Sequence, residues 1–519
     1  MNAKLSHCIS RTLFLLPVLM LAFHQETAAQ EKYEKTLGVN LWNYGRNANG
    51  LRLDEYHDNA SFAQIQAGIE NGGFHASNQA DESLQAGAKA LTVTWSPRIS
   101  MIGSFSFDQI RGKDMCGSMF IRPGQYPFDV LEFTPGIKIL QEYSFEGGIA
   151  ADMGEHWRIG GRMDFESDNY AKRKDLRHTN YALDLELVPS IMYTYGSFSA
   201  GLSYIFRKTS ESIQAEEIGT SAETYDAFLD KGLMYGAYQA WDGSGIHLAE
   251  AGVDRFPVHE YTNGVAAQVQ LGEFYGEAEF DITSGTVGEK DYTWFTFPGR
   301  KFSATAGYRI KGENALHVIR FLYGWSLQQN DEYVIDKTTT GGVTTPQTYG
   351  CNRIFERRSL SVGPRYKLFS DKLYMDAGLG ITSNKRQSTL CFPYSHDESF
   401  TMLDADISAS LTAGKWILGM ELSYADEIIG QGPVIVDPVF DPDNGWSRPY
   451  RLSDWYRLNH EWETCGKIGA GAFVKIYFRI GKADNLFIRA DVSLLKGMDL
   501  QYINGSTRTG TFLKIGYDF

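Results

Sequence analysis

The chain has 519 residues, a formal net charge of −14 and a mean hydropathy of −0.30. The excess of carboxylates excludes nucleic acid as the main partner, and so polar a chain is not a bundle of transmembrane helices. Glycine is frequent (53 residues), proline is rare (15), and aromatic residues make up 13%, which is a composition typical of many twisted strands joined by tight turns.

Residues 1–29 predict a secretory signal peptide. Lys4 and Arg11 form its positive region, an apolar run follows from Leu13 to Phe23, and Thr27-Ala28-Ala29 is a small-residue cleavage site. The run is far shorter than the roughly 20 residues that span a bilayer. We therefore expect the chain to be exported from the cytoplasm.

Residues 30–59 precede the first predicted strand. Asparagine and glycine are too frequent in 40–51 for a strand, yet this stretch contains large apolar side chains that need a packing partner. We expect it to enter the lumen of a following barrel from the periplasmic side as a partial plug. The plug candidates are Trp42, Tyr44 and Arg46, the last of which would meet an inward carboxylate. The alternatives are a docking motif for a periplasmic partner and a disordered lead-in.

From residue 60 to residue 519, segments of about ten residues alternate between apolar and polar side chains. The clearest segments are Leu373 to Ile381, Leu403 to Leu411, Ile468 to Ile480, Leu486 to Leu494 and Leu513 to Phe519. Such alternation gives a strand one apolar and one polar face, which a helix could not do. We predict an all-β fold, a transmembrane antiparallel barrel of about 18 strands, with 16 strands as the alternative count. A soluble sandwich would need fewer long strands.

Short and long connections alternate along this region. Short turns are predicted at 154–155, 196–197, 274–275, 312–313, 371–372, 414–415 and 483–484, and long loops near 110–136, 213–263, 330–351 and 429–463. Outer-membrane barrels have short periplasmic turns and long extracellular loops. Counted from a first strand near 60–70, the pattern places the protein in the cell outer membrane and returns Phe519 to the periplasmic rim.

The polar faces of the C-terminal strands supply candidates for the lumen lining. These candidates are Asp404, Asp406, Glu421, Lys467, Lys475, Arg479, Arg489, Asp491 and Lys514. Opposed charges in a pore can orient polar solutes. The alternative is that these side chains pair across neighbouring strands or hold a plug. On the opposite face, Ile476 and Val492 are expected to contact lipid, where an introduced charge would impair assembly.

Four cysteines remain after the signal peptide. Cys351 and Cys391 lie at the predicted outer ends of two strands joined by the turn at 371–372, so a disulfide between them is one expectation, and two separate thiols are the other. Tryptophans near predicted strand ends are expected to form an interfacial girdle: Trp157, Trp294, Trp325, Trp416, Trp455 and Trp462. Solvated rim positions are expected for His156, His178, His259 and His396.

Two stretches of sequence resemble known patterns. Gly516-Tyr-Asp-Phe519 resembles the C-terminal signal by which the barrel-assembly machinery recognises outer-membrane clients. The stretches Asn40 to Leu51, Gly103 to Asp108 and Asp175 to Arg177 resemble an uncharacterised outer-membrane barrel family of the Bacteroidota. The resemblance would cover nearly the whole mature chain, and it implies location and fold without implying an activity.

The sequence contains no specific pairing of nucleophile and base, no metal-ligand pattern and no cofactor motif. We therefore expect a protein that is not an enzyme and that needs no metal or cofactor. The preferred function is a channel, or a channel-like component of an envelope transport assembly, because about eighteen strands can enclose an aqueous lumen. The alternative is a non-conducting surface binding protein or structural partner. The expected partners are outer-membrane lipids, the barrel-assembly machinery and a lipoprotein or transport-complex component.

Overall fold

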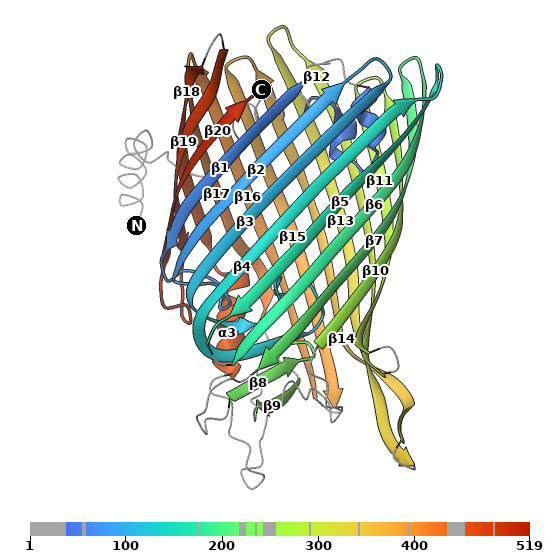
Figure 1. Ribbon diagram of the computed structural model, residues 1–519, viewed down its shortest axis with the longest axis vertical. Helices are drawn as coiled ribbons and strands as arrows, with labels where there is room; N and C mark the ends of the chain where they lie inside the picture. Colours follow the sequence, from blue (N-terminus) through green and yellow to red (C-terminus); the bar gives the residue numbers. More distant parts are fainter. Residues whose placement is uncertain are drawn as a thin grey trace, which may run out of the picture.

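The computed structural model is a tall barrel of tilted strands (Figure 1). It describes residues 38–53, 59–174, 176–216, 225–233, 236–241, 256–289, 292–340, 343–391, 394–432, 452–480 and 483–519. The predicted signal peptide and residues 30–37 lie outside these ranges.

Twenty strands are present in the described residues. Their bounds are β1 Ala60–Asn71, β2 Glu82–Trp95, β3 Ile99–Ser118, β4 Asp129–Asp152, β5 Trp157–Lys172, β6 Arg177–Tyr195, β7 Phe198–Glu216, β8 Tyr225–Asp230, β9 Gly236–Trp241, β10 Phe256–Leu271, β11 Phe274–Glu289, β12 Tyr292–Lys311, β13 Ala315–Thr340, β14 Val343–Ser370, β15 Leu373–Cys391, β16 Tyr394–Ala413, β17 Trp416–Gln431, β18 Lys467–Ile480, β19 Ala483–Gly497 and β20 Thr507–Asp518. The helical elements are η1 Leu41–Tyr44, η2 Ala48–Arg52 and α3 Leu452–Thr464.

Eighteen of these strands form one closed antiparallel sheet. Each strand pairs with the next along the chain, β7 pairs with β10, and β20 returns to pair with β1. The remaining strands, β8 and β9, form a hairpin that attaches to the outer end of β4. The predicted fold class and the count of eighteen strands are therefore confirmed.

The closing seam joins the two ends of the described sheet. The ladder runs from Phe62 opposite Asp518 to Asn71 opposite Thr509, and the backbone N–H of Phe519 donates to the carbonyl of Ser61 at 2.9 Å. Because a closed ladder has no edge, every strand can be hydrogen-bonded on both sides, as the hydrocarbon of a bilayer requires.

The outer face of the barrel carries a belt of exposed apolar side chains. On β19, for example, Val492 is 45% exposed, whereas its neighbour Asp491 is 7% exposed and faces the interior. A closed sheet of this size with apolar side chains outside and charged side chains inside is the architecture of an outer-membrane barrel. The protein is therefore an integral outer-membrane β-barrel.

The two ends of the barrel differ as expected. Short turns gather at the end that holds the C-terminus, at the top of Figure 1, and α3, β8 and β9 lie at the other end. Two predicted turns are misplaced by two residues, because β11 already begins at Phe274 and β19 at Ala483. The turn end is the periplasmic end and the loop end is extracellular.

Several of the predicted long loops contain regular structure, and the stretch 213–263 contains β8 and β9. Instead of a loop near 330–351, β13 and β14 continue as a hairpin that extends beyond the barrel (Figure 1), with register shifts at Asn330/Asp331 and at Val334/Ile335. Bulges of this kind let a ladder bend without ending. The stretch 429–463 contains most of α3. No helix among the described residues is long and apolar enough to cross a membrane.

The assignment of faces can be tested at Val492. Val492→Arg should destabilise the folded barrel by about 2–4 kcal/mol, because an arginine at mid-membrane depth on the lipid face loses its hydration. Val492→Ala is the matched control, since it shortens the same side chain without adding charge. Urea titrations of the proteins refolded into lipid vesicles would measure the free energy of unfolding of both variants. Equal stability of the two variants would show that Val492 does not face lipid.

Candidate functional site

The N-terminal insert, residues 38–53, lies inside the periplasmic half of the barrel (the short blue coils near the top of Figure 1). It forms η1 and η2, each capped by an asparagine. The side-chain oxygen of Asn40 accepts from the N–H of Trp42 at 3.1 Å, and that of Asn47 accepts from the N–H of Asn49 at 3.0 Å. Asparagine is a preferred N-cap, so the asparagines that argue against a strand here build two short helical turns.

Apolar contacts anchor the insert to the barrel wall. Trp42 is fully buried, its ring meets that of Tyr275 edge-on at 5.5 Å between centroids, and its indole Nε1 donates to Gln270 Oε1 at 2.5 Å. Leu41 packs against Gly307 of β12, where a Cβ would lie 2.9 Å from Leu41 Cδ2. The absence of a side chain at Gly307 makes room for the insert.

Arg46 fixes the insert to a carboxylate-lined part of the wall. Its guanidinium bonds Glu186 of β6 at 2.8 Å and Glu279 of β11 at 2.7 Å, and its backbone N–H donates to Glu277 at 3.2 Å. Charge-assisted bonds of this kind are about twice as strong as neutral ones. The insert is thus held across two strands that are far apart in sequence.

The opposite side of the insert contacts basic residues. The guanidinium of Arg320 lies 3.8 Å from the ring centroid of Tyr44, and Lys367 Nζ lies 5.5 Å from it. At the end of the insert, Arg52 forms an ion pair with Asp152 of β4. The structure therefore brings the three plug candidates, Trp42, Tyr44 and Arg46, together in one insert that touches several walls of the barrel.

Four of the predicted lumen-lining residues form one buried group on β18, β19 and β20. Arg489 Nε bonds Asp491 at 2.8 Å, Lys514 Nζ lies 3.5 Å from the same carboxylate, and Lys475 Nζ lies 3.6 Å from the ring centroid of Phe487. These side chains face inward and interact with one another and with neighbouring strands. This group matches the alternative in which opposed charges pair across strands.

The other predicted lining residues are dispersed. Asp406 is 3.2 Å from Arg365, and Lys467 Nζ lies 4.7 Å from the ring centroid of Trp462 on α3. Asp404 is exposed and Glu421 is half-buried. Arg479 is exposed just beyond a register shift at Phe478/Arg479.

The carboxylates that bind Arg46 belong to an acidic wall on β5, β6, β7, β10 and β11, outside the strands that sequence reasoning singled out. Its inward residues include Glu166, Asp168, Asp184, Glu186, Glu211, Glu260, Glu279 and Asp281. The sequence signal was alternation of charge with apolar residues, as in Asp184-Leu-Glu186. The N-terminal insert binds this acidic wall through Arg46.

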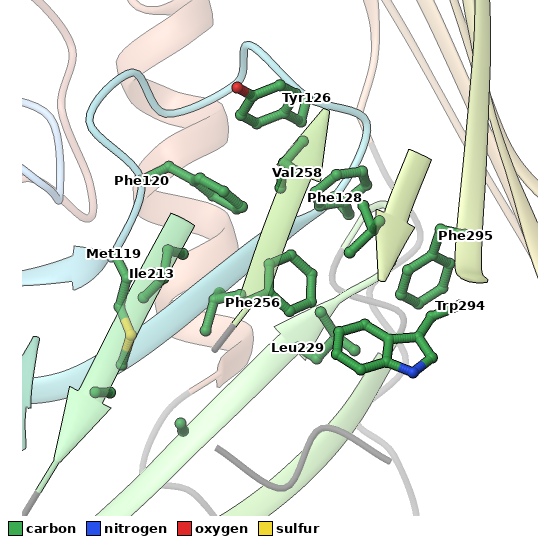
Figure 2. Close-up of a cluster of buried hydrophobic side chains, with 14 of the residues drawn as sticks. Met119, Phe120, Tyr126, Phe128, Ile213, Leu229, Phe256, Val258, Trp294 and Phe295 are labelled. Atoms are coloured by element: carbon green, nitrogen blue, oxygen red, sulfur yellow. The ribbon is translucent and has the colours of Figure 1, made fainter. Parts of the chain in front are cut away.

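From the extracellular side, the β3–β4 loop, residues 119–128, folds into the barrel (Figure 2). Phe128 lies 5.8 Å from Phe256 and 5.9 Å from Phe295 between ring centroids, and Tyr126 lies 5.7 Å from Phe297. Together with other buried apolar side chains these rings form a core inside the barrel mouth. The loop is therefore packed inside the barrel.

Polar contacts also hold the β3–β4 loop. Arg122 pairs with Glu166 at 2.7 Å and Asp168 at 2.9 Å on β5. From the other side of the barrel, Arg357 of β14 donates to the backbone carbonyls of Gly124 at 2.6 Å and Gln125 at 2.9 Å. The loop binds the acidic wall through its own arginine, Arg122, as the N-terminal insert does through Arg46.

Helix α3 lies in the mouth beside this loop. The carboxylate of Glu461 accepts from the backbone N–H groups of Gln501, Tyr502 (2.8 Å) and Ile503 (2.7 Å). Toward the barrel wall, Glu463 binds Arg386 of β15 in a two-pronged pair at 2.6 and 2.7 Å. The first contact fixes the helix to the connection between β19 and β20, and the second fixes it to β15, which is distant in sequence.

The prediction of an interfacial girdle position is wrong for three tryptophans. Trp294 belongs to the aromatic core inside the mouth (Figure 2), and Trp455 and Trp462 lie on α3. Trp157 and Trp416 are about half exposed, at 49% and 48%, next to periplasmic turns. Their positions are those of interfacial anchors. Trp325 is half-buried within β13.

Two further sequence expectations differ from the structure. Cys351 is an exposed free thiol, so the bridge to Cys391 is not formed. The β14–β15 ladder ends at Phe355 and Ser388, which leaves Cys351 beyond its last pair, and the side chain of Cys391 lies outside the described residues. His178 is buried and bonds Asn180 at 2.9 Å instead of lying solvated at the rim.

An outer cavity of about 540 Å³ remains between the β3–β4 loop, α3 and the barrel wall. Aromatic residues from both inserted elements line it, among them Tyr126, Phe128 and Trp455. Arg357 and Arg386 also line it, as do Glu398 and Glu463. Within the described part of the chain, no group of three or more His, Cys, Asp or Glu side chains could hold a metal ion. The cavity is a mixed polar and aromatic site at the extracellular end of the barrel.

Comparison with known proteins assigns the sequence to a family model. Residues 50–519 match the model described as "Family of unknown function (DUF6850)". The match begins within the N-terminal insert, so Trp42 and Arg46 precede it. No curated protein sequence matches the chain.

Solved structures also match. The ferric enterobactin receptor PfeA from Pseudomonas aeruginosa is 9% identical, with a TM-score of 0.41 and coverage of 90% of this chain and 82% of that chain. The ferric preacinetobactin receptor BauA from Acinetobacter baumannii is 6% identical (TM-score 0.38; 89% and 80% coverage). The ferric yersiniabactin uptake receptor FyuA from Yersinia pestis is 7% identical (TM-score 0.38; 89% and 80% coverage). The fold assignment itself rests on the strand pairing of this chain.

The docking of α3 should depend on pH through His460. His460 Nδ1 lies 2.6 Å from Glu398. Burial lowers the pKa of His460, but the hydrogen bond to Glu398 and the charges of Glu398, Glu427 and Glu463 outweigh it and raise the pKa above 6.5. The resulting stabilisation is therefore fully present below the unfolded pKa and is lost as the pH rises through the raised pKa.

We expect His460→Gln to lower the melting temperature at pH 6 and to have a smaller effect at pH 9, where less of the wild-type imidazole is protonated. Thermal unfolding of both proteins at each pH measures this difference, and each pH supplies its own wild-type control. The nearby Arg386 keeps its charge at both values. If His460→Gln lowered the melting temperature by the same amount at pH 6 and pH 9, the contribution of His460 would not depend on its protonation.

Proposed function

We propose that this chain, which belongs to the Family of unknown function (DUF6850), is a gated solute-transport barrel whose lumen is occluded at rest by the N-terminal insert. The proposal includes no catalytic role. An eighteen-stranded barrel is wide enough to enclose a lumen, so the side chains and inserts inside it decide whether solutes pass.

The observation that carries this proposal is the docking of Arg46 between Glu186 and Glu279. An insert held by side-chain ion pairs and by one buried tryptophan can leave without breaking any strand of the barrel. Its polar contacts with the wall can be replaced by water, because the inward face of β6 and β11 is already charged. These features favour a removable plug over a permanent part of the sheet.

A non-conducting surface binding protein is the second candidate. The aromatic core beneath the outer cavity favours it, because the β3–β4 loop fills the extracellular mouth as well. A transport-complex or lipoprotein partner would act on the N-terminal insert from the periplasmic side under the first proposal and on the extracellular loops under the second. Conductance after release of the insert separates the two.

Deleting residues 38–53 should raise the single-channel conductance of the purified protein in planar bilayers severalfold. Arg46→Glu should do so partially, since the new carboxylate would face Glu186, Glu277 and Glu279, and loss of a partly buried pair costs on the order of 3 kcal/mol. Arg46→Lys is the matched control because it keeps the charge, and it should stay near the wild-type level. A deletion variant that folds and does not conduct would overturn the transport proposal.

A disulfide tether tests whether the insert itself must move. Leu41→Cys with Gly307→Cys joins the insert to β12 at the point where Leu41 contacts Gly307. In an Arg46→Glu background, the oxidised double variant should lose the added conductance and regain it on reduction. The Arg46→Glu protein without the added cysteines controls for the native thiols. Conductance that persists in the oxidised, tethered protein would place the open path elsewhere.

A further inference from the structure

Arg357 is a cation in the outer cavity without a carboxylate partner among the described residues. Its guanidinium donates to two backbone carbonyls, those of Gly124 and Gln125, and its contact with Gly124 is accessible from the cavity. A guanidinium has five N–H donors, so the two carbonyls leave donors for a further acceptor. Neutral carbonyls do not balance its charge.

The other arginine of the cavity is already neutralised. Arg386 pairs with Glu463 at 2.6 Å and with Glu398 at 3.2 Å, and Glu398 also binds His460. Buried charges in proteins are normally paired, because an unpaired charge loses its hydration without compensation. The contrast between the two arginines marks Arg357 as the position where an anion is missing.

We propose that the outer cavity binds a small extracellular solute through one oxyanion, a carboxylate or a phosphate, held by Arg357. The planar guanidinium matches both groups because its parallel N–H donors meet two oxygens of the same anion. The volume of about 540 Å³ lies within the usual range for small-molecule sites, roughly 300–1,000 Å³.

The rest of the lining defines the remainder of the ligand. Tyr126, Phe128 and Trp455 present rings to the cavity, and rings favour a flat or apolar body. Asp230 also lines it. Its carboxylate disfavours a polyanion, so the site selects a solute with a single oxyanion and an aromatic or apolar remainder.

This inference rests on the proposed function only for the fate of the ligand, since binding itself needs no open lumen. The solute would contact Arg357 of β14, Tyr126 of the β3–β4 loop and Trp455 of α3. It would thereby join the two elements that fill the extracellular mouth. Binding is measured in detergent solution, so the outcome is separate from that of the conductance experiments.

The test uses the full-length protein and three probes of one shape: 2-naphthoate, 2-naphthyl phosphate and the neutral 2-naphthamide. Isothermal titration should show saturable binding of at least one of the two anions, weakened by salt, and at least tenfold weaker binding of the amide. Preference between carboxylate and phosphate identifies the anion class. This comparison is made on the unmodified protein and does not depend on how a variant folds.

Arg357→Gln should weaken binding of the preferred anion at least tenfold. Arg358→Gln is the matched control, because Arg358 is the next residue on β14, is 59% exposed and pairs with Glu356 at 2.6 Å. It should leave the affinity unchanged. Equal binding of the acid and the amide, no saturable binding of either anion, or equal affinity of a folded Arg357→Gln protein and the wild type would each overturn the proposal.

Discussion

Closure of the sheet is the constraint on which the rest of the structure depends. In hydrocarbon, an unpaired backbone N–H or carbonyl costs several kcal/mol, and the pairing of β20 with β1 removes the edges at which such groups would be exposed. Once the ladder is closed, the register fixes the face of every residue. A shift by one residue would turn Asp491 toward lipid and Val492 toward the lumen, so the alternation along β19 and the closed ladder require each other.

Closure of the sheet also creates a lumen, and the inward side chains of the strands leave part of its wall with an excess of negative charge. Carboxylates gather on one wall. Arg207 on that wall pairs with Asp184, and two further arginines come from outside it. Arg46 reaches Glu186 and Glu279 from the periplasmic side, and Arg122 reaches Glu166 and Asp168 from the extracellular side. Two inserts with unrelated sequences therefore use the same interaction: an arginine on a segment outside the sheet binds carboxylates on the strands.

The alternation of apolar and polar side chains made the barrel predictable, because each strand shows this period in its own sequence. The eighteen strands, the turn at 371–372 and the inward face of Asp491 all follow from neighbours in sequence. The mouth of the barrel was not predictable in this way. Trp294 is buried by Phe256, and α3 is fixed by the amides of 501–503 and by Arg386, so their environments depend on partners far along the chain. Cys351 is not paired with Cys391 because the β14–β15 ladder ends at Phe355 and Ser388, an end point that alternation does not reveal.

The two inserts also differ in how they are tied to the sheet, and under the proposed gating this difference favours movement of the N-terminal insert. The β3–β4 loop is held at both ends, by β3 at Ser118 and by β4 at Asp129, so withdrawing it would strain two strands and expose an aromatic core. The N-terminal insert precedes β1 in the chain and contacts the barrel wall through side chains such as Trp42 and Arg46. Its departure breaks side-chain contacts and leaves the ladder whole. Gating from the periplasmic side therefore requires less structural change than gating from the extracellular mouth.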